Sequence, residues 1–405
     1  MKILFFASYP DIAIGYSRIA NIISNHLAEK GHKIYYVGIS NFGTNKCNRY
    51  VHPDITLIDA YQEEKDNGTD ELYGVNVICK YIKKINPDVV FMYNDLIVSC
   101  RILNNFIKYN IVKTFRLYIY LDLVYKYEKI ELIKHVDNFA DMIFVFSDCW
   151  KNNLIDMGIS ENKIDVILHG IDKKFFQTDK QIARSKFNFK EDDFIILNSN
   201  RNSYRKCIDK TIEAFMKFLK IKNFDKKIKL FLNMNFIVGG YDIFNLIKIC
   251  CIKYDINYDD IIMNHIYKYN DFNVMSDDML NSLYNACDIG INTCVGEGFG
   301  LCNLEHGSLG KPQIISNVGG LSDIFSNDYA ILINPITEIY LSDSQDYHGG
   351  YLEICKVDDF VEALIKYYDN PDVLKIHGNL SIKILKEKYN WINILNDFSQ
   401  KYFNI

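Results

Sequence analysis

The sequence is poor in proline and tryptophan and carries no basic excess. Its 405 residues include 6 prolines and 2 tryptophans, and 46 lysines and arginines stand against 51 aspartates and glutamates. The resulting net charge is −5. General nucleic-acid-binding proteins more often have a basic excess or a long basic stripe, so we expect no nucleic-acid partner.

Long apolar runs are also missing. No run of about 18 apolar residues occurs, which is the length that a membrane-spanning helix needs. The N-terminal run 3–7 is too short for the core of a signal peptide and is soon followed by Pro10. We therefore expect a cytoplasmic protein with neither a signal peptide nor a transmembrane segment. Short lysine clusters such as 226–229 predict solvated surface, with association to a membrane surface as the alternative.

The cysteines form no metal-binding pattern. Eleven cysteines stand at irregular spacings without a Cys-x-x-Cys pair, and no His-x-x-x-His pair occurs. Structural zinc sites use such closely spaced pairs, so we expect no metal. An odd number of cysteines in a chain of this length predicts reduced thiols in a cytosol-like compartment.

The sequence does contain a regular alternation of short apolar runs and segments of helical period. This alternation is typical of an α/β fold with parallel sheets, and the length suffices for two domains. We expect one Rossmann-like domain over 1–172, a second over 173–389, and a last helix over about 390–405 that packs back on the first. The expected strands are 2–8, 33–39, 89–93, 115–121 and 142–147, followed by 194–199, 229–234, 261–265, 289–294, 313–316 and 330–333.

The richest candidate site follows the expected strand 289–294. Ligands of such sheets bind beyond the carboxyl ends of the strands. The run 296–305, Gly-Glu-Gly-Phe-Gly-Leu-Cys-Asn-Leu-Glu, places three glycines within five residues before a helix, so its backbone can approach a ligand and its amides can favour a phosphate. Glu297 can accept hydrogen bonds from sugar hydroxyls and Glu305 from ribose hydroxyls. A glycine-rich turn with one surface and one capping glutamate is the alternative.

A second candidate follows the expected strand 194–199. Arg201, Arg205 and Lys206 place three cations within six residues. Arginine grips a diphosphate as a fork and lysine acts as a point charge, so the segment can stabilise a departing nucleoside diphosphate without Mg²⁺. A solvated basic loop is the alternative.

The other strand ends carry weaker signals. Gly15 opens the first expected helix, but no Gly-x-Gly-x-x-Gly pattern accompanies it. Asp122 follows the expected strand 115–121, where a carboxylate can equally be a helix cap. No Ser–His–Asp or Cys–His set can be assembled from the sequence.

These residues together resemble family 4 of the retaining glycosyltransferases, which have the GT-B fold. The run 296–305 is similar to that family's Glu-x7-Glu motif and continues in the same way through 310–312 and 316–320. The segment 201–206 is similar to its Arg/Lys phosphate-binding loop. The resemblance is weakest over 40–85 and 335–385. The runs 200–209 and 285–320 are also similar to glycosyltransferases of large DNA viruses, and a viral source would place the protein in the host cytoplasm or the virion.

The resemblance implies roles for individual residues. Arg201 and Lys206 would hold the donor diphosphate, Glu297 would contact the transferred sugar, and Glu305 would bind the ribose. Many members have a histidine after the fourth strand of the first domain, where Asp122 is the best substitute in this chain. The other implied donor contacts are Gly15, Asn200, Arg205, Gly298, Phe299, Gly300 and Leu301, with His265 and Ile266 at the end of the third strand beside the base.

The reaction that the resemblance implies is transfer of a hexosyl group with retention of configuration. The N-terminal domain would bind the acceptor and the C-terminal domain the donor, across a central cleft. The donor would be GDP-mannose or a UDP-hexose and the acceptor a glycan, lipid or protein, without metal or cofactor. The alternatives are a catalytically silent sugar-nucleotide- or glycan-binding protein and a nucleotide-sugar epimerase with the same fold.

Overall fold

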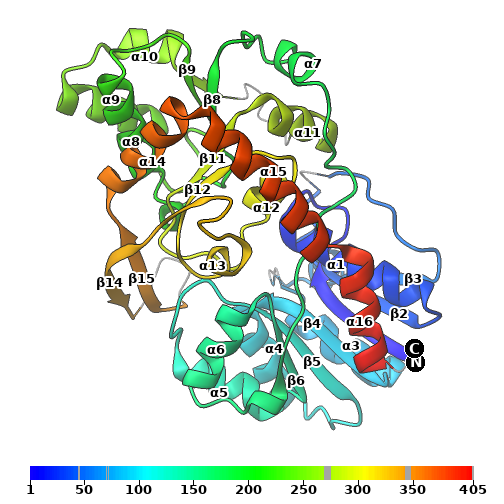
Figure 1. Ribbon diagram of the computed structural model, residues 1–405. Coiled ribbons are helices and arrows are strands. Elements are labelled where there is room, and N and C mark those ends of the chain that lie inside the picture. The colour runs from blue at the N-terminus through cyan, green and yellow to red at the C-terminus, as the bar shows by residue number, and fades with distance from the viewer. Residues whose placement is uncertain (44–45, 70, 72, 269–274, 343–347, 404–405) are drawn as a thin grey trace. The chain divides into compact units, whose positions relative to one another are not determined.

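The computed structural model describes residues 1–405 except 44–45, 70, 72, 269–274, 343–347 and 404–405 (Figure 1). The chain divides into two compact units. The first comprises Met1–His169, Tyr340–Tyr351 and Trp391–Ile405, and the second comprises Gly170–Ile339 and Leu352–Asn390. The divisions lie close to the expected boundaries at 172 and 389, whereas the sequence had not placed Tyr340–Tyr351 in the first unit.

The first unit is built on a parallel sheet of seven strands in the order β3-β2-β1-β4-β5-β6-β7. Its strands are β1 Lys2–Ser8, β2 Lys33–Ile39, β3 Ile55–Asp59, β4 Val89–Asp95, β5 Arg116–Asp122, β6 Met142–Val145 and β7 Ile164–Val166. The α-helices described in this unit are α1 Gly15–Glu29, α2 Ala60–Asp66, α3 Val75–Ile85, α4 Leu96–Lys108, α5 Ile130–Phe139, α6 Asp148–Asp156 and α16 Trp391–Phe403.

Aromatic side chains fill the core of the first unit. Phe91 of β4 stacks on Phe5 of β1 with ring centroids 4.9 Å apart. From α16, Phe398 meets Phe91 at 6.0 Å and Phe144 of β6 at 5.5 Å. Successive residues of β1 and β4 are buried, which means that both faces of these strands are covered, and the strands therefore appear as continuous apolar runs in the sequence. The last helix therefore completes the core of the first unit.

The second unit has a parallel sheet of six strands in the order β10-β9-β8-β11-β12-β13. Its strands are β8 Phe194–Asn198, β9 Ile228–Leu232, β10 Ile266–Lys268, β11 Ile289–Asn292, β12 Gln313–Ser316 and β13 Ile331–Ile333. The α-helices described there are α7 Lys180–Ser185, α8 Ile208–Ile221, α9 Ile243–Tyr254, α10 Tyr258–Asn264, α11 Asp277–Ala286, α12 Leu301–Ser308, α13 Leu321–Ile324, α14 Val357–Asp369 and α15 Pro371–Lys388. The predicted class, α/β with two Rossmann-like parallel sheets, is confirmed.

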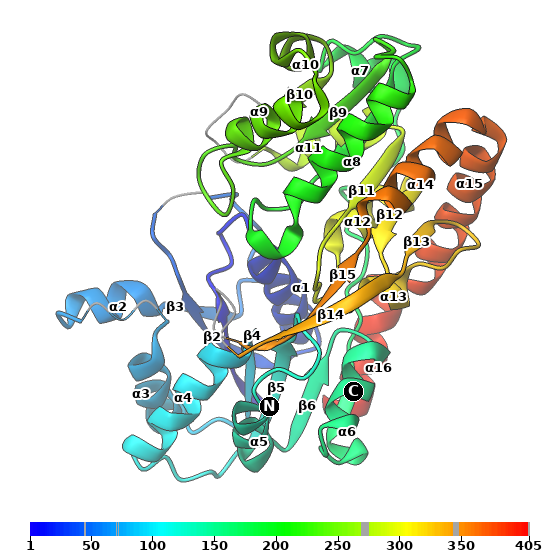
Figure 2. The same cartoon turned by 90° about the vertical axis from the view of Figure 1, so that its left-hand side faces the viewer.

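Successive residues of β8 serve two separate cores. Ile196 packs with residues of α8, α9 and α14, whereas its neighbours Ile195 and Leu197 pack with residues of α7 and α11. Side chains alternate between the two faces of a strand, so both faces of this sheet are covered by helices. Figure 2 shows α8 beside α14 on one of them.

Two parts of the second unit differ from the expectation. The predicted strand 261–265 is wrong, because these residues belong to α10 and to the residue that ends it. Asn257 caps this helix by accepting a hydrogen bond from the Asp260 amide at 2.9 Å. A short apolar run cannot distinguish a strand from a buried helical turn. The two-stranded sheet of β14 Pro335–Leu341 and β15 Gly350–Cys355, which contains residues of both units, was not predicted.

Candidate functional site

The candidate site of the second unit lies where the strand order of its sheet reverses. β8 and β11 are neighbours in the sheet, although β9 and β10 come between them in the chain. Loops that leave the carboxyl ends of such a strand pair are the usual ligand-binding position in α/β proteins. One of these loops carries the basic segment 201–206 and the other carries the glycine-rich segment 296–300.

The structure brings the two segments into direct contact. The Lys206 ammonium donates a hydrogen bond to the Glu297 carboxylate, and both side chains are only 8% exposed. The Arg205 guanidinium lies 3.5 Å from the same carboxylate and also donates to the Gly296 carbonyl at 2.9 Å. The site is therefore a buried carboxylate flanked by two cations.

The charge state of Glu297 follows from these neighbours. Burial raises the pKa of this carboxyl, whereas Lys206 and Arg205 lower it, and the net pKa lies below the ordinary value of 4.5. Opposite charges within hydrogen-bonding distance favour the ionised form. Glu297 is thus a carboxylate at neutral pH and can accept hydrogen bonds only.

The backbone of the basic segment is fixed by its neighbours. The Arg205 carbonyl accepts from the Val295 amide at 3.0 Å. Asn202 is buried, and its side-chain amide donates to the Asn235 and Tyr241 carbonyls at 3.0 and 2.7 Å. Arg201, in contrast, has an exposed side chain. The backbone of the segment is thus held in place, while the Arg201 side chain can bind an anionic ligand that arrives from solvent.

The glycine-rich turn has a conformation that requires glycine. Gly300 has φ +102°, and a Cβ atom there would lie 2.4 Å from Leu321 Cδ2. A Cβ atom on Gly320 would lie 2.3 Å from the Gly298 carbonyl oxygen, and the Gly320 amide donates to the Glu297 carbonyl at 2.9 Å. No side chain caps the start of α12. The turn thus leads into a helix start whose amides can receive an anion.

Glu305 occupies the buried side of α12. Its side chain is 3% exposed, and the Tyr284 hydroxyl donates to its Oε2 at 3.1 Å. Asn200 is buried near the same helix, where the Cys302 thiol lies 3.6 Å from its amide oxygen. The sequence had singled out Glu305 and Asn200 but not Tyr284, which lies 21 positions before Glu305.

His265 and Ile266 were expected to contact the base because they were placed at the carboxyl end of the third strand. The structure does not place them there. The strand β10 begins at Ile266 and ends at Lys268, so both residues lie at its amino end. His265 ends α10, is fully buried, and its Nδ1 lies 2.9 Å from the Ile228 carbonyl. The carboxyl end of β10 leads into 269–274, which lie outside the described residues.

In the first unit, two of the predicted residues lie near one another. Gly15 opens α1 after β1, and Asp122 ends β5. The hydroxyl of Tyr16, the next residue after Gly15, donates a hydrogen bond to the Asp122 carboxylate. Burial and the neighbouring Asp122 raise the pKa of Tyr16 well above its ordinary value, so the phenol of this pair is neutral. The sequence did not indicate Tyr16.

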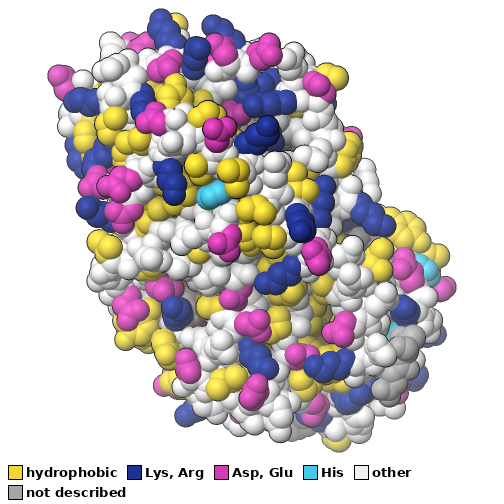
Figure 3. Space-filling view, viewed as in Figure 1, with side chains coloured by type: hydrophobic (Ala, Val, Ile, Leu, Met, Phe, Trp, Pro, Cys, Tyr) yellow, Lys and Arg dark blue, Asp and Glu magenta, His cyan; other side chains and the backbone are white. Residues whose placement is uncertain are grey.

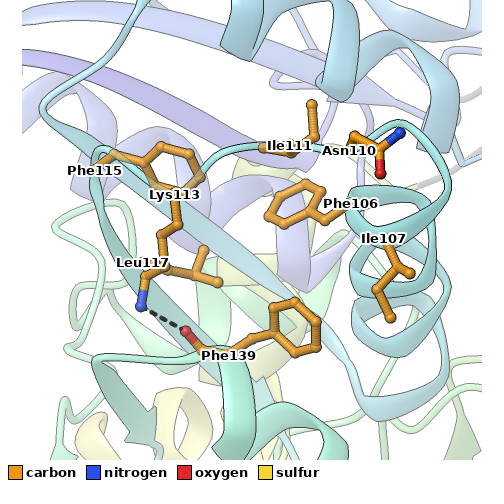
Figure 4. A pocket seen from close by; sticks show the side chains of 8 residues that line it. All are labelled: Phe106, Ile107, Asn110, Ile111, Lys113, Phe115, Leu117 and Phe139. Atoms are coloured by element: carbon orange, nitrogen blue, oxygen red, sulfur yellow. Dashed lines mark hydrogen bonds between the residues drawn. The ribbon is translucent and has the colours of Figure 1, made fainter.

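A cavity of about 270 Å³ opens elsewhere in the first unit (Figure 4). It is lined by Phe106, Ile107, Asn110, Ile111, Lys113, Phe115, Leu117 and Phe139. Lys113 closes one side by donating to the Phe139 carbonyl at 2.8 Å. Because the cavity lies where β5 begins, at the amino end of the sheet, we do not assign the chemistry to it.

The remaining features are the surface charge, the possible metal ligands and the length of the helices. Lysine and arginine side chains are interspersed with aspartate and glutamate over the face shown in Figure 3. Among the described residues, no group of three or more His, Cys, Asp or Glu could hold a metal ion. None of the helices described is long and apolar enough to cross a membrane.

The family comparison concerns mainly the second unit. Residues 179–379 match the family model of the group 1 glycosyl transferases. An uncharacterized glycosyltransferase of Methanocaldococcus jannaschii is 25% identical over 247 residues, which are 60% of this chain and 54% of that protein. The chain thus spans about half the length of the curated relative that it matches. The suggested similarity to viral members stays a prediction.

Two solved structures share the fold of the whole chain. Sucrose-phosphate synthase from Thermosynechococcus elongatus has a TM-score of 0.73 at 15% identity, covering 100% of this chain and 98% of its own. Anabaena HepE in complex with UDP-glucose has a TM-score of 0.71 at 12% identity, covering 100% of both chains. At such identities the likeness establishes the fold alone, which is GT-B. The segment 179–379 is therefore similar to the group 1 glycosyl transferases, and the solved structures show that the whole chain has their two-domain fold.

Proposed function

We propose that the protein transfers a hexosyl group from a UDP-linked sugar to a glycan, lipid or protein acceptor, with retention of configuration and without a metal. The observation that carries the proposal is the contact of Lys206 and Arg205 with Glu297 at the carboxyl ends of β8 and β11. The complex of HepE with UDP-glucose favours uridine over guanine, and GDP-mannose remains the alternative donor.

The cations would act on the leaving group. When the bond between sugar and diphosphate breaks, negative charge develops on the departing phosphate. Lys206 is held in place before the reaction by Glu297, and Arg201, five residues earlier in the basic segment, is exposed to solvent. Charges that are fixed in advance in a partly dry site stabilise a developing anion without reorganisation. This would allow departure of UDP without Mg²⁺.

The acceptor would attack the sugar from the side that the diphosphate leaves. In this scheme the acceptor oxygen forms the new bond to the anomeric carbon, the bond to the diphosphate breaks, and the acceptor proton passes to the departing phosphate oxygen. The scheme needs no strong protein base. Glu297, as a carboxylate, would orient the sugar through its hydroxyls, and Asp122 would serve the acceptor side. Positioning and charge stabilisation would then supply most of the rate enhancement.

Turnover of UDP-glucose is expected to continue in EDTA. The donor panel would contain UDP-glucose, UDP-galactose, UDP-N-acetylglucosamine and GDP-mannose, and release of the nucleoside diphosphate would be measured with and without the chelator. Equal rates are expected because Lys206 and the two arginines supply the countercharge that a divalent ion would otherwise supply. Loss of activity in EDTA that Mn²⁺ restores would contradict the metal-free scheme.

The same assay separates the alternative functions. A silent sugar-nucleotide-binding protein would bind a donor but release no nucleoside diphosphate with any acceptor. A nucleotide-sugar epimerase would change the configuration of the sugar, which chromatography of the nucleotide sugar detects. Release of UDP together with a glycosylated acceptor is the outcome that the proposed function requires.

A further inference from the structure

Tyr284 lies beside the predicted ribose-binding residue without having been assigned a role. It stands near the end of α11 and is 1% exposed. Its ring contacts those of Phe175 and His306, with ring centroids 5.4 Å away in each case. Because both neighbours restrict the ring, the direction of its hydroxyl is fixed by packing.

The hydroxyl points at one oxygen of Glu305. It donates to Oε2 at 3.1 Å, and both residues are buried. A glutamate side chain has several rotatable bonds, and fixing them during ligand binding costs entropy. A carboxylate that is already oriented avoids that cost.

We propose that Tyr284 is a positioning residue of the nucleotide site. Its hydroxyl holds Glu305 in the orientation that accepts the ribose hydroxyls, so Tyr284 contributes to selection of nucleotides with an intact ribose. This inference rests on the proposed function and on the ribose contact that the family resemblance implies for Glu305. It adds a residue on a different helix, α11, to the specificity of the site.

The test compares UDP with 2′,3′-dideoxy-UDP, which lacks both ribose hydroxyls. Calorimetry on the full chain is expected to show that the wild type prefers UDP by at least about tenfold, the scale of a hydrogen bond to a charged group. Glu305→Ala should bind both nucleotides equally. Tyr284→Phe should reduce the preference to about threefold or less through loss of orientation, with the affinity for the dideoxy nucleotide unchanged.

Tyr367→Phe is the matched control. Tyr367 is also buried in the second unit, and its hydroxyl lies 2.9 Å from His377 Nδ1 on α15. This variant loses a comparable buried contact of a tyrosine hydroxyl, so it reports the structural effect of the substitution alone. It is expected to keep the wild-type preference for UDP, and its melting temperature gives the reference for that of Tyr284→Phe.

Three outcomes would overturn the inference. If Tyr284→Phe keeps the wild-type preference while Glu305→Ala loses it, the inference fails and the proposed function stands. If Tyr284→Phe weakens both nucleotides by the same factor, the role of Tyr284 is structural only. If the wild type binds neither UDP nor GDP, the proposed function and the inference fail together.

Discussion

Replacing Lys206 with alanine is expected to lower turnover at saturating donor by about 10²–10³-fold, the scale of losing one preorganised donor to a developing anion. The ammonium group is almost inaccessible to solvent and is held by Glu297 at the carboxyl end of β8. Its interaction with a departing phosphate is therefore weakly screened. The loss should appear mainly in kcat, because the charge on the phosphate grows as the reaction proceeds.

Initial rates of UDP release measure this effect, and Lys210→Ala is the control. Lys210 lies on α8, four residues further along the chain, and its ammonium donates to the Cys355 carbonyl at 2.9 Å. The control variant therefore removes a partly buried lysine of the same unit that lies outside the basic segment. A rate for Lys206→Ala near that of Lys210→Ala would sink the assignment of Lys206 to the diphosphate.

Glu297→Ala is expected to lower the free energy of unfolding by about 3–5 kcal/mol, the usual cost of removing one partner of a buried ion pair. The substitution leaves the Lys206 ammonium buried with Arg205 nearby and without its carboxylate. Denaturant unfolding measures the change. The double variant Lys206→Met, Glu297→Leu should recover most of the lost stability, because a buried ion pair can be replaced by apolar side chains of similar volume.

The double variant separates structure from chemistry. It is expected to be folded and stable but inactive, since it has neither the cation for the phosphate nor the carboxylate for the sugar. Measurable transfer by this variant would show that the pair is a structural ion pair only. Stability as low as that of Glu297→Ala would contradict the account of the buried charge.

The pH dependence of stability follows from the same pair. The folded-state pKa of Glu297 lies below its ordinary value of 4.5 because Lys206 and Arg205 outweigh the effect of burial. The pair therefore stabilises the folded state fully above that ordinary value, and the contribution is lost as the pH falls through the lowered pKa. The acid limb of the stability curve should be shallower in the double variant.

The sequence indicated the candidate residues of the second unit more directly than the Tyr16–Asp122 pair of the first unit. β11 is buried on both faces, so its residues form an apolar run, and the following glycines mark the turn where Gly300 needs a positive φ. Both signals are local in the sequence. The pairing of Tyr16 with Asp122 is not local, because it joins residues 106 positions apart and arises only from the order of the strands.

The errors have equally physical reasons. Ile261 is buried and Met263 is 77% exposed, and this one-sided burial belongs to a helix that the short apolar run did not reveal. β14 is exposed along nearly its whole length, so no alternation of buried and exposed residues marks it as a strand. The contact of Tyr284 with Glu305 likewise depends on how α11 and α12 pack.

A thermal-shift panel of UDP, GDP, dTDP and ADP without added metal tests the central claim most directly. A ligand that binds only the folded state raises the melting temperature through mass action. The account predicts a clear shift with UDP, or with GDP if the donor is GDP-mannose, that Arg201→Ala reduces strongly. No shift with any nucleotide, or an equal shift in wild type and Arg201→Ala, would contradict a sugar-nucleotide site built on the basic segment.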